Sequence, residues 1–199
     1  MSYVYYPGCQ YTDLSPEVSV RMQNYLEQRF HMKITGCCRK NSHLLTEQDT
    51  AFCVCPTCLT NLRTRAPRAT VLSLWELLAD DDRFPWPDYQ ARAITVQDCM
   101  DTCNQPGLQH AVRKILSRMN VTAIEIEQSF SRADFCRPRT EEQIRRTMKH
   151  CKNYPTDSAV CYCTGCLKGI NLSGKQGIHL IDLIMGRNIT ESQNQITIA

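Results

Sequence analysis

Short apolar runs that end at turn residues alternate along this chain with segments whose apolar positions recur at helical spacing. Residues 3–6 form a β-rich run that stops at Pro7-Gly8, and residues 16–30 then show the helical period. The same reading predicts further strands over 32–35, 50–54, 93–96, 122–126 and 158–161, and further helices over 69–79, 108–119, 141–150 and 177–185. This alternation is typical of the α/β class with parallel sheets.

The predicted order of elements occurs twice. Residues 55–62, CPTCLTNL, correspond to residues 163–170, CTGCLKGI, and an apolar segment follows each at a similar distance. An internal duplication explains this correspondence. We therefore expect two tandem, pseudo-repeated α/β units, joined where charge and proline interrupt the periodicity. The expected limits are 1–80 for the first unit, 81–92 for the linker, 93–186 for the second unit and 187–199 for a polar tail.

Composition narrows the protein class. The chain has 199 residues, of which 42% are apolar, so it can bury a core without disulfides. Its 13 cysteines are odd in number and the chain is not a short secreted module, which favours thiol ligands over a disulfide framework. We see no signal-peptide pattern and no membrane-spanning apolar stretch, and we expect a cytoplasmic protein. A net charge of +3 does not favour a nucleic-acid partner.

Cysteines of the first half follow the ends of predicted strands. They are Cys9, the adjacent pair Cys37 and Cys38, and the pair Cys55 and Cys58. Parallel strands end at one edge of a sheet, so these loops can converge on a metal site there. A C-x2-C pair can direct two sulfur atoms at one metal centre. Adjacent cysteines usually point apart, which suits a multinuclear cluster better than one zinc ion.

The second half offers four thiols in corresponding places: Cys99, Cys136, Cys163 and Cys166. Four thiolates can hold either zinc or an iron–sulfur cluster, so this reasoning leaves both metals open. Cys103 or Cys161 could add a fifth ligand, and we assign no role to Cys53 or Cys151.

These motifs together carry a resemblance to a family. They are YYPGC at 5–9, GCC at 36–38, CPTC at 55–58, TVQDC at 95–99 and CTGC at 163–166. The chain resembles the cysteine-rich CCG domain family, known from the B subunit of heterodisulfide reductase, over roughly residues 3–186. The resemblance implies a non-cubane four-iron four-sulfur cluster held by the five cysteines of the first half. In catalytic members it also implies reduction of a disulfide bound at cluster iron.

Other readings of the same residues are simpler. The five thiols could be buried and inert, or Cys55 and Cys58 could form a thioredoxin-like redox pair. The basic segment 137–152 could dock an acidic redox partner or nucleic acid, although such a run is usually a solvated helix face. Trp75, with Leu74 and Leu78 at helical spacing, is expected in the core.

We therefore expect an iron–sulfur oxidoreductase or oxidoreductase subunit that acts on a disulfide or thiol, or relays electrons. The first five cysteines would form its active centre. The chain has no ferredoxin-type cysteine run, so electrons would come from a ferredoxin-like or flavin-containing partner. The alternative is a non-catalytic module, stabilised by zinc or a cluster, that binds another protein.

Overall fold

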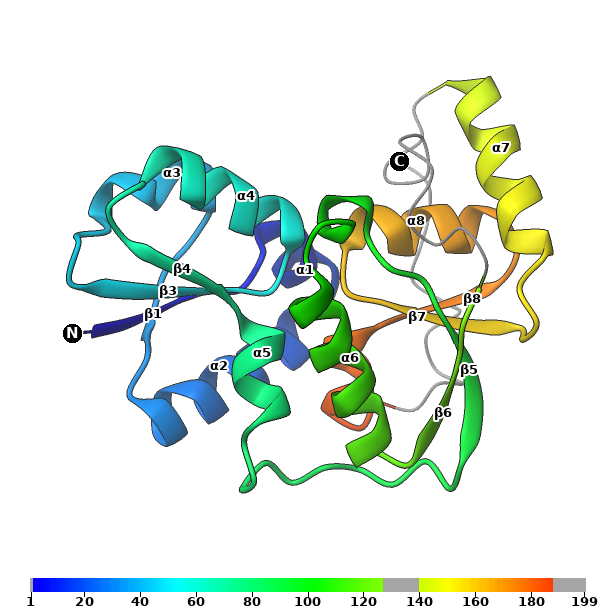
Figure 1. The fold of residues 1–199 in the computed structure, drawn as a ribbon, viewed down its shortest axis with the longest axis horizontal. Helices are drawn as coiled ribbons and strands as arrows, with labels where there is room; N and C mark the ends of the chain where they lie inside the picture. The colour runs from blue at the N-terminus through cyan, green and yellow to red at the C-terminus, as the bar shows by residue number, and fades with distance from the viewer. Residues whose placement is uncertain (1, 127–139, 188–199) are drawn as a thin grey trace. The chain divides into compact units, whose positions relative to one another are not determined.

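The computed structural model describes residues 2–126 and 140–187. Within them the chain forms two four-stranded sheets, each parallel throughout, with helices around them (Figure 1). The chain divides into two compact units, one of Met1–Phe84 with Asn104–Ile115 and one of Pro85–Cys103 with Leu116–Ala199. The predicted fold class, tandem α/β units with parallel sheets, is confirmed.

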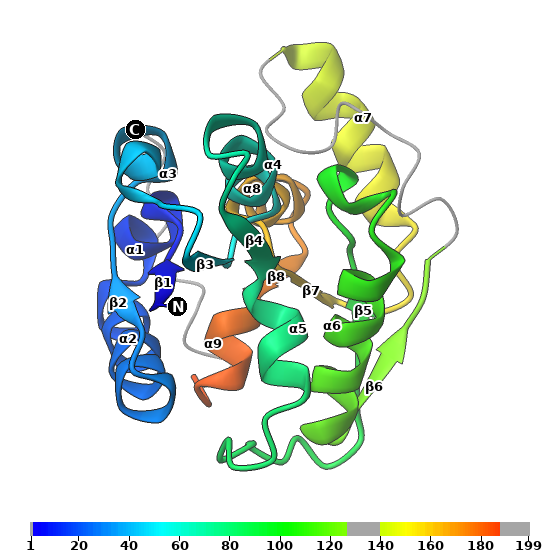
Figure 2. The same cartoon turned by 60° about the vertical axis from the view of Figure 1, so that its left-hand side comes forward.

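The first sheet has the strand order β2-β1-β3-β4. Its elements, with the helices and turns between them, are β1 (Ser2–Tyr6), α1 (Cys9–Leu14), α2 (Pro16–Phe30), β2 (Lys33–Ile34), α3 (Cys38–Asn41), η1 (Ser42–Leu44), β3 (Asp49–Cys53), α4 (Pro56–Arg65), β4 (Thr70–Ser73) and α5 (Leu74–Ala79). Figure 2 shows α1 stacked on α2 beside β1 and β2. Tyr6 pairs with Cys53, and Cys53 pairs with Ser73. Three strands therefore end level, and the loops after them leave from one edge of the sheet.

The second sheet repeats this topology with the order β6-β5-β7-β8. Its elements are β5 (Arg92–Val96), η2 (Met100–Thr102), α6 (Pro106–Arg118), β6 (Val121–Ile124), α7 (Glu141–Lys152), β7 (Ser158–Cys161), α8 (Thr164–Leu172), β8 (Gln176–His179) and α9 (Leu180–Ile184). Val96 pairs with Val160, and Cys161 pairs with His179. The equal strand order and the level strand ends are what an internal duplication predicts.

Two predicted helices were wrong in their first halves. Residues 69–79 form β4 and then α5, and residues 177–185 form β8 and then α9. In β4 buried and exposed residues alternate, which is the period of a strand. Each new helix begins at a side chain that caps it, since Ser73 Oγ accepts from the Trp75 N–H and His179 Nδ1 accepts from the Ile181 N–H.

Sequence periodicity also missed α4 and α8, the helices that begin at the two C-x2-C pairs. Their first turns contain cysteine, proline, threonine and glycine, so the apolar period is weak where each helix begins. The predicted core role of Trp75 is confirmed: its side chain is fully buried, and its Nε1 donates to the Val54 carbonyl at 3.1 Å. This bond ties α5 to the loop that carries Cys55.

No helix in the described ranges, 2–126 and 140–187, is both long and apolar enough to cross a membrane. Of the predicted polar tail, only Arg187 belongs to the described part of the chain.

Candidate metal centres at the strand ends

The five cysteines predicted as ligands in the first unit all lie where a strand or loop gives way to a helix. Cys9 is the first residue of α1, and Cys37 occupies the N-cap position of α3, which Cys38 begins. Cys55 caps α4, and Cys58 lies in its first turn. Helix N-termini carry partial positive charge from unpaired N–H groups, which stabilises thiolates. The fold thus places all five thiols at or beside helix N-termini, although burial and neighbouring thiols still raise the pKa of Cys9, as neighbouring thiols and burial do for Cys58.

Hydrogen bonds divide these thiols into a pair and a trio. The Cys9 thiol is hydrogen-bonded to Cys37. The Cys58 thiol is hydrogen-bonded to both Cys38 and Cys55. The charges of Cys37 and Cys38 also act on Cys9, so the pair and the trio are neighbours. The structure therefore brings the five predicted residues into one neighbourhood, although their role as metal ligands stays a prediction.

Electrostatics within the trio favour one thiolate and oppose more. The hydrogen bond from Cys58 lowers the pKa of Cys38 from 9.0 to about 6, with help from Asn61, whose Nδ2 lies 3.9 Å from the Cys38 sulfur. The same hydrogen bond raises the pKa of Cys58. Burial raises the pKa of Cys53, the last residue of β3. Several thiolates can coexist at such short range only beside a cation. The donor set, sulfur throughout, fits a thiophilic metal or an iron–sulfur cluster.

Access to the first group is open on one side. Cys9 is exposed, Cys37 and Cys55 are half-buried, and Cys38 and Cys58 are buried. A reagent or a partner can therefore reach Cys9 and, in part, Cys37 and Cys55, whereas Cys38 and Cys58 lie inside the protein.

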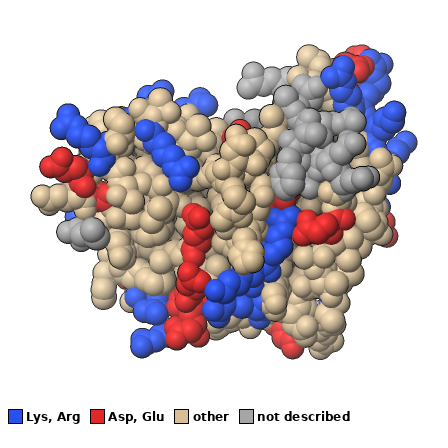
Figure 3. Space-filling view, in the orientation of Figure 1, with Lys and Arg blue, Asp and Glu red and all other residues tan. Residues whose placement is uncertain are grey.

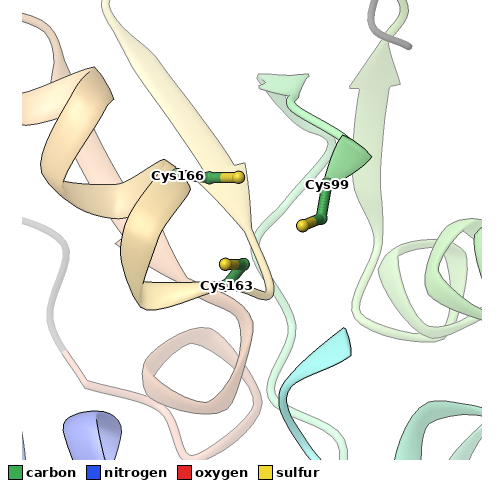
Figure 4. A group of neighbouring side chains, drawn as sticks. All are labelled: Cys99, Cys163 and Cys166. Atoms are coloured by element: carbon green, nitrogen blue, oxygen red, sulfur yellow. The ribbon is translucent and has the colours of Figure 1, made fainter. Parts of the chain in front are cut away.

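The second unit contains a tighter group. The sulfur atoms of Cys99, Cys163 and Cys166 all lie within 4.8 Å of one another, and within the described ranges this is the one such group of possible metal-ligand atoms (Figure 4). Cys99 follows β5, and the other two come from the start of α8. The three side chains are fully buried. This triad can hold a metal, but its geometry does not distinguish zinc from a cluster. The fourth predicted ligand, Cys136, lies outside the described residues.

A buried hydrogen-bond network holds the Cys99 loop. The Tyr162 hydroxyl donates to Asp98 Oδ1 at 2.7 Å and accepts from the Cys99 N–H at 3.4 Å. It also lies 2.9 Å from the Thr102 hydroxyl, which donates to the Cys99 carbonyl at 2.6 Å. Beside them Gln97 donates to the Asp98 carbonyl at 2.7 Å. Both peptide groups of Cys99 are thus fixed by buried side chains, as is common around metal ligands.

Sequence reasoning missed Asn61, Tyr162 and Asp98. Asn61 lies three residues after Cys58, so recognition of α4 as a helix would have placed it on the same face. Tyr162 stands between Cys161 and Cys163, and Asp98 precedes Cys99, but nothing in their spacing shows that they meet.

The remaining described cysteines are members of neither group, although Cys53 and Cys161 lie next to them. Cys103 is exposed, and Cys151 is buried in α7. Cys161 ends β7, and its sulfur lies 3.6 Å from the Cys163 carbonyl oxygen. Cys53 ends β3 at the corresponding place in the first unit. The suggested fifth ligands of the second site, Cys103 and Cys161, are not members of the triad.

No family model and no curated protein matches the chain. Solved structures that align with it include the glutamate racemase isoform RacE1 from Bacillus anthracis, at 8% identity over 93% of this chain and 78% of that one, with a TM-score of 0.38. A periplasmic ribose ABC transporter from Conexibacter woesei DSM 14684 aligns at 8% identity over 86% of this chain and 66% of that one, with a TM-score of 0.31. Likenesses this weak say nothing about activity.

Proposed function

We propose that the protein is an iron–sulfur oxidoreductase, or a subunit of one, of the heterodisulfide reductase B type. The observation that carries the proposal is the neighbourhood of Cys9, Cys37, Cys38, Cys55 and Cys58 at the carboxyl edge of one parallel sheet. Such edges are where α/β folds bind ligands. The resemblance to the CCG domain family supports the same residues.

The number and chemistry of the donors favour a cluster over zinc in the first site. Zinc in structural sites takes four ligands in a tetrahedron, whereas five thiols gather here. We propose that these five cysteines hold a non-cubane four-iron four-sulfur cluster. When bound, it would supply electrons singly and iron to which a substrate sulfur can bind.

This chain's own residues would provide access and support. Cys9 is exposed and Cys37 half-buried, so a disulfide or thiol substrate can approach from their side. Asn61 donates toward the Cys38 sulfur and stabilises its negative charge. Hydrogen bonds to cysteine sulfur are one means by which proteins tune the reduction potential of a cluster.

The second site would stabilise the fold and would not take part in the reaction. Its three described ligands are fully buried, so no substrate can reach them without unfolding. We propose that they hold zinc or a closed cluster, with Cys136 as the fourth ligand. Electrons for the first site would come from a ferredoxin-like or flavin-containing partner.

Metal analysis after purification without oxygen tests the proposal. We expect brown protein with about four irons and four labile sulfides in the first site. Cys38→Ser should remove that signal. Cys151→Ser, a control in another buried thiol, should leave metal content unchanged because Cys151 belongs to neither group. Colourless protein that holds only zinc, even after anaerobic reconstitution, would overturn the iron–sulfur reading.

A non-catalytic module is the second candidate. The complete burial of Cys99, Cys163 and Cys166 favours it, because such a site can only stabilise the fold. Zinc in both sites, with no reducible centre, would be the result in its favour.

A further inference from the structure

Exposed cationic side chains occur on α3 and at the end of α4 in the first unit. Arg39 and Lys40 lie on α3, directly after the Cys37 and Cys38 doublet. Arg65 ends α4, and Arg68 lies in the loop that follows it. All four are exposed, and with His43 of η1 they form what we call the α3–α4 cationic surface. Figure 3 shows Lys and Arg gathered over this part of the first unit.

The cations of this surface have an acidic neighbour, Glu47, which lines a hollow together with Arg65 and Arg68. Across residues 2–126 and 140–187, none of the four forms an ion pair. On the basic helix α7, Arg145 and Arg146 both pair with Glu142, at 2.8 and 2.9 Å, whereas Lys149 forms no ion pair within the described residues. A cation without an ion pair attracts an acidic partner more strongly than a cation whose charge is offset by a neighbouring carboxylate. Two of the three cations at 145–149 are thus paired and none of the four on the α3–α4 cationic surface is, which favours that surface over α7 for docking.

The width of the surface points to a protein as its occupant. It draws on two helices, with Arg39 and Lys40 on α3 and Arg65 at the end of α4, a helix about 15 Å long at the rise of an α-helix. At the far end is a hollow of about 480 Å³, lined by η1, the loop after it and the end of α4. Its lining includes His43, Arg65 and Arg68 but no Phe, Tyr or Trp, the large aromatic side chains on which successive bases usually stack. Glu47 also lines it, which opposes a small anion bound there alone.

We infer that the α3–α4 cationic surface docks an acidic electron-transfer protein. The inference rests on the proposed function, since it places the electron donor beside Cys9 and Cys37. Each docking delivers one electron, and the partner leaves oxidised. Cleavage of one disulfide bond consumes two electrons and two protons and yields two thiols.

Binding measurements on the full chain, purified without oxygen, test this inference. The probe is an acidic [2Fe–2S] ferredoxin, with Kd measured by calorimetry at low and at raised salt. The test variant combines Lys40→Glu, Arg65→Glu and Arg68→Glu. The control combines Arg145→Glu, Arg146→Glu and Lys149→Glu on α7, which changes net charge equally at three exposed positions. Circular dichroism and iron content check that both variants fold and load alike.

We expect the test variant to raise Kd about tenfold or more and to flatten its salt dependence, and the control to change Kd less than about threefold. The cluster-deficient Cys38→Ser chain should still bind, because the surface and not the metal provides the charge. Equal losses in both variants, or tighter binding of a short DNA duplex than of ferredoxin, would refute the inference. Wild-type protein without iron and sulfide would instead refute the proposed function. The Kd values of the test and control variants would still show whether the α3–α4 cationic surface binds ferredoxin.

Discussion

The thiol of Cys58 donates a hydrogen bond to the sulfur of Cys38, joining the first turn of α4 to the first residue of α3. This contact sets the charge state of the trio, because it stabilises the Cys38 thiolate and keeps Cys58 protonated. A metal bound here would displace the Cys58 proton, so metal affinity should rise with pH.

In metal-free protein, this contact predicts a thiolate that titrates near pH 6 and belongs to Cys38. Because its pKa is lowered from 9.0 to about 6, Cys38 stabilises the fold most above pH 9, and this contribution is lost as pH falls through 6. Thiolate absorbance should therefore appear with a midpoint near pH 6. Cys58→Ala should move that midpoint upward, and Cys38→Ser should abolish it. A titration unchanged by either substitution would show that another group is responsible.

The two sites should differ when metal is removed. The first is open at Cys9, whereas the triad of Cys99, Cys163 and Cys166 is fully buried, so a chelator should remove metal from the first site faster.

Cys163→Ser should lower the free energy of unfolding by about 2 kcal/mol or more, since a structural metal contributes directly to folding. Cys9→Ser should chiefly remove the reductant-dependent spectrum. Two spectroscopically equivalent, redox-active clusters would contradict this asymmetry.

Tyr162→Phe should loosen the second site. It removes the hydroxyl that joins the Cys99 N–H, Thr102 and Asp98, and leaves a buried carboxylate with one donor fewer. The expected cost is about 1–3 kcal/mol, with faster metal loss from the second site only.

Tyr89→Phe is the matched control for this change, because it also removes one tyrosine hydrogen bond in the second unit, the 2.7 Å bond to the Leu183 carbonyl. It should lower stability without affecting metal release. Similar release rates in the two variants would show that Tyr162 supports the fold and not the Cys99 loop.

Gly8→Ala should disturb the first site through the backbone. Gly8 precedes Cys9 and has a φ of 77°, a conformation that costs a residue with a Cβ about 1 kcal/mol or more. Gly174→Ala, at a φ of 82° with open space around it, carries the same strain in the second unit, away from the ligands of the first site. Both variants should lose similar stability in thermal unfolding, but only Gly8→Ala should lower the iron content. Equal iron content in the two would show that Cys9 is not a ligand.

The sequence by itself determined the features that depend on local signals. The bounds of α2 and β7 follow from apolar periodicity, and the duplication follows from the repeated C-x2-C segments. The placement of cysteines at strand ends follows from the turn residues beside them. These signals act within a few residues, so no tertiary contact is needed to recognise them.

Only the tertiary structure decided which side chains meet. The division of five thiols into a pair and a trio, the burial of the triad and the bridge from Tyr162 to Asp98 all join residues distant in sequence. The split of 69–79 into β4 and α5 was also decided there, because an edge position beside β3 gives β4 the hydrogen bonds that a helix would otherwise supply. Long-range pairing and burial override local propensity, and the sequence pattern records neither.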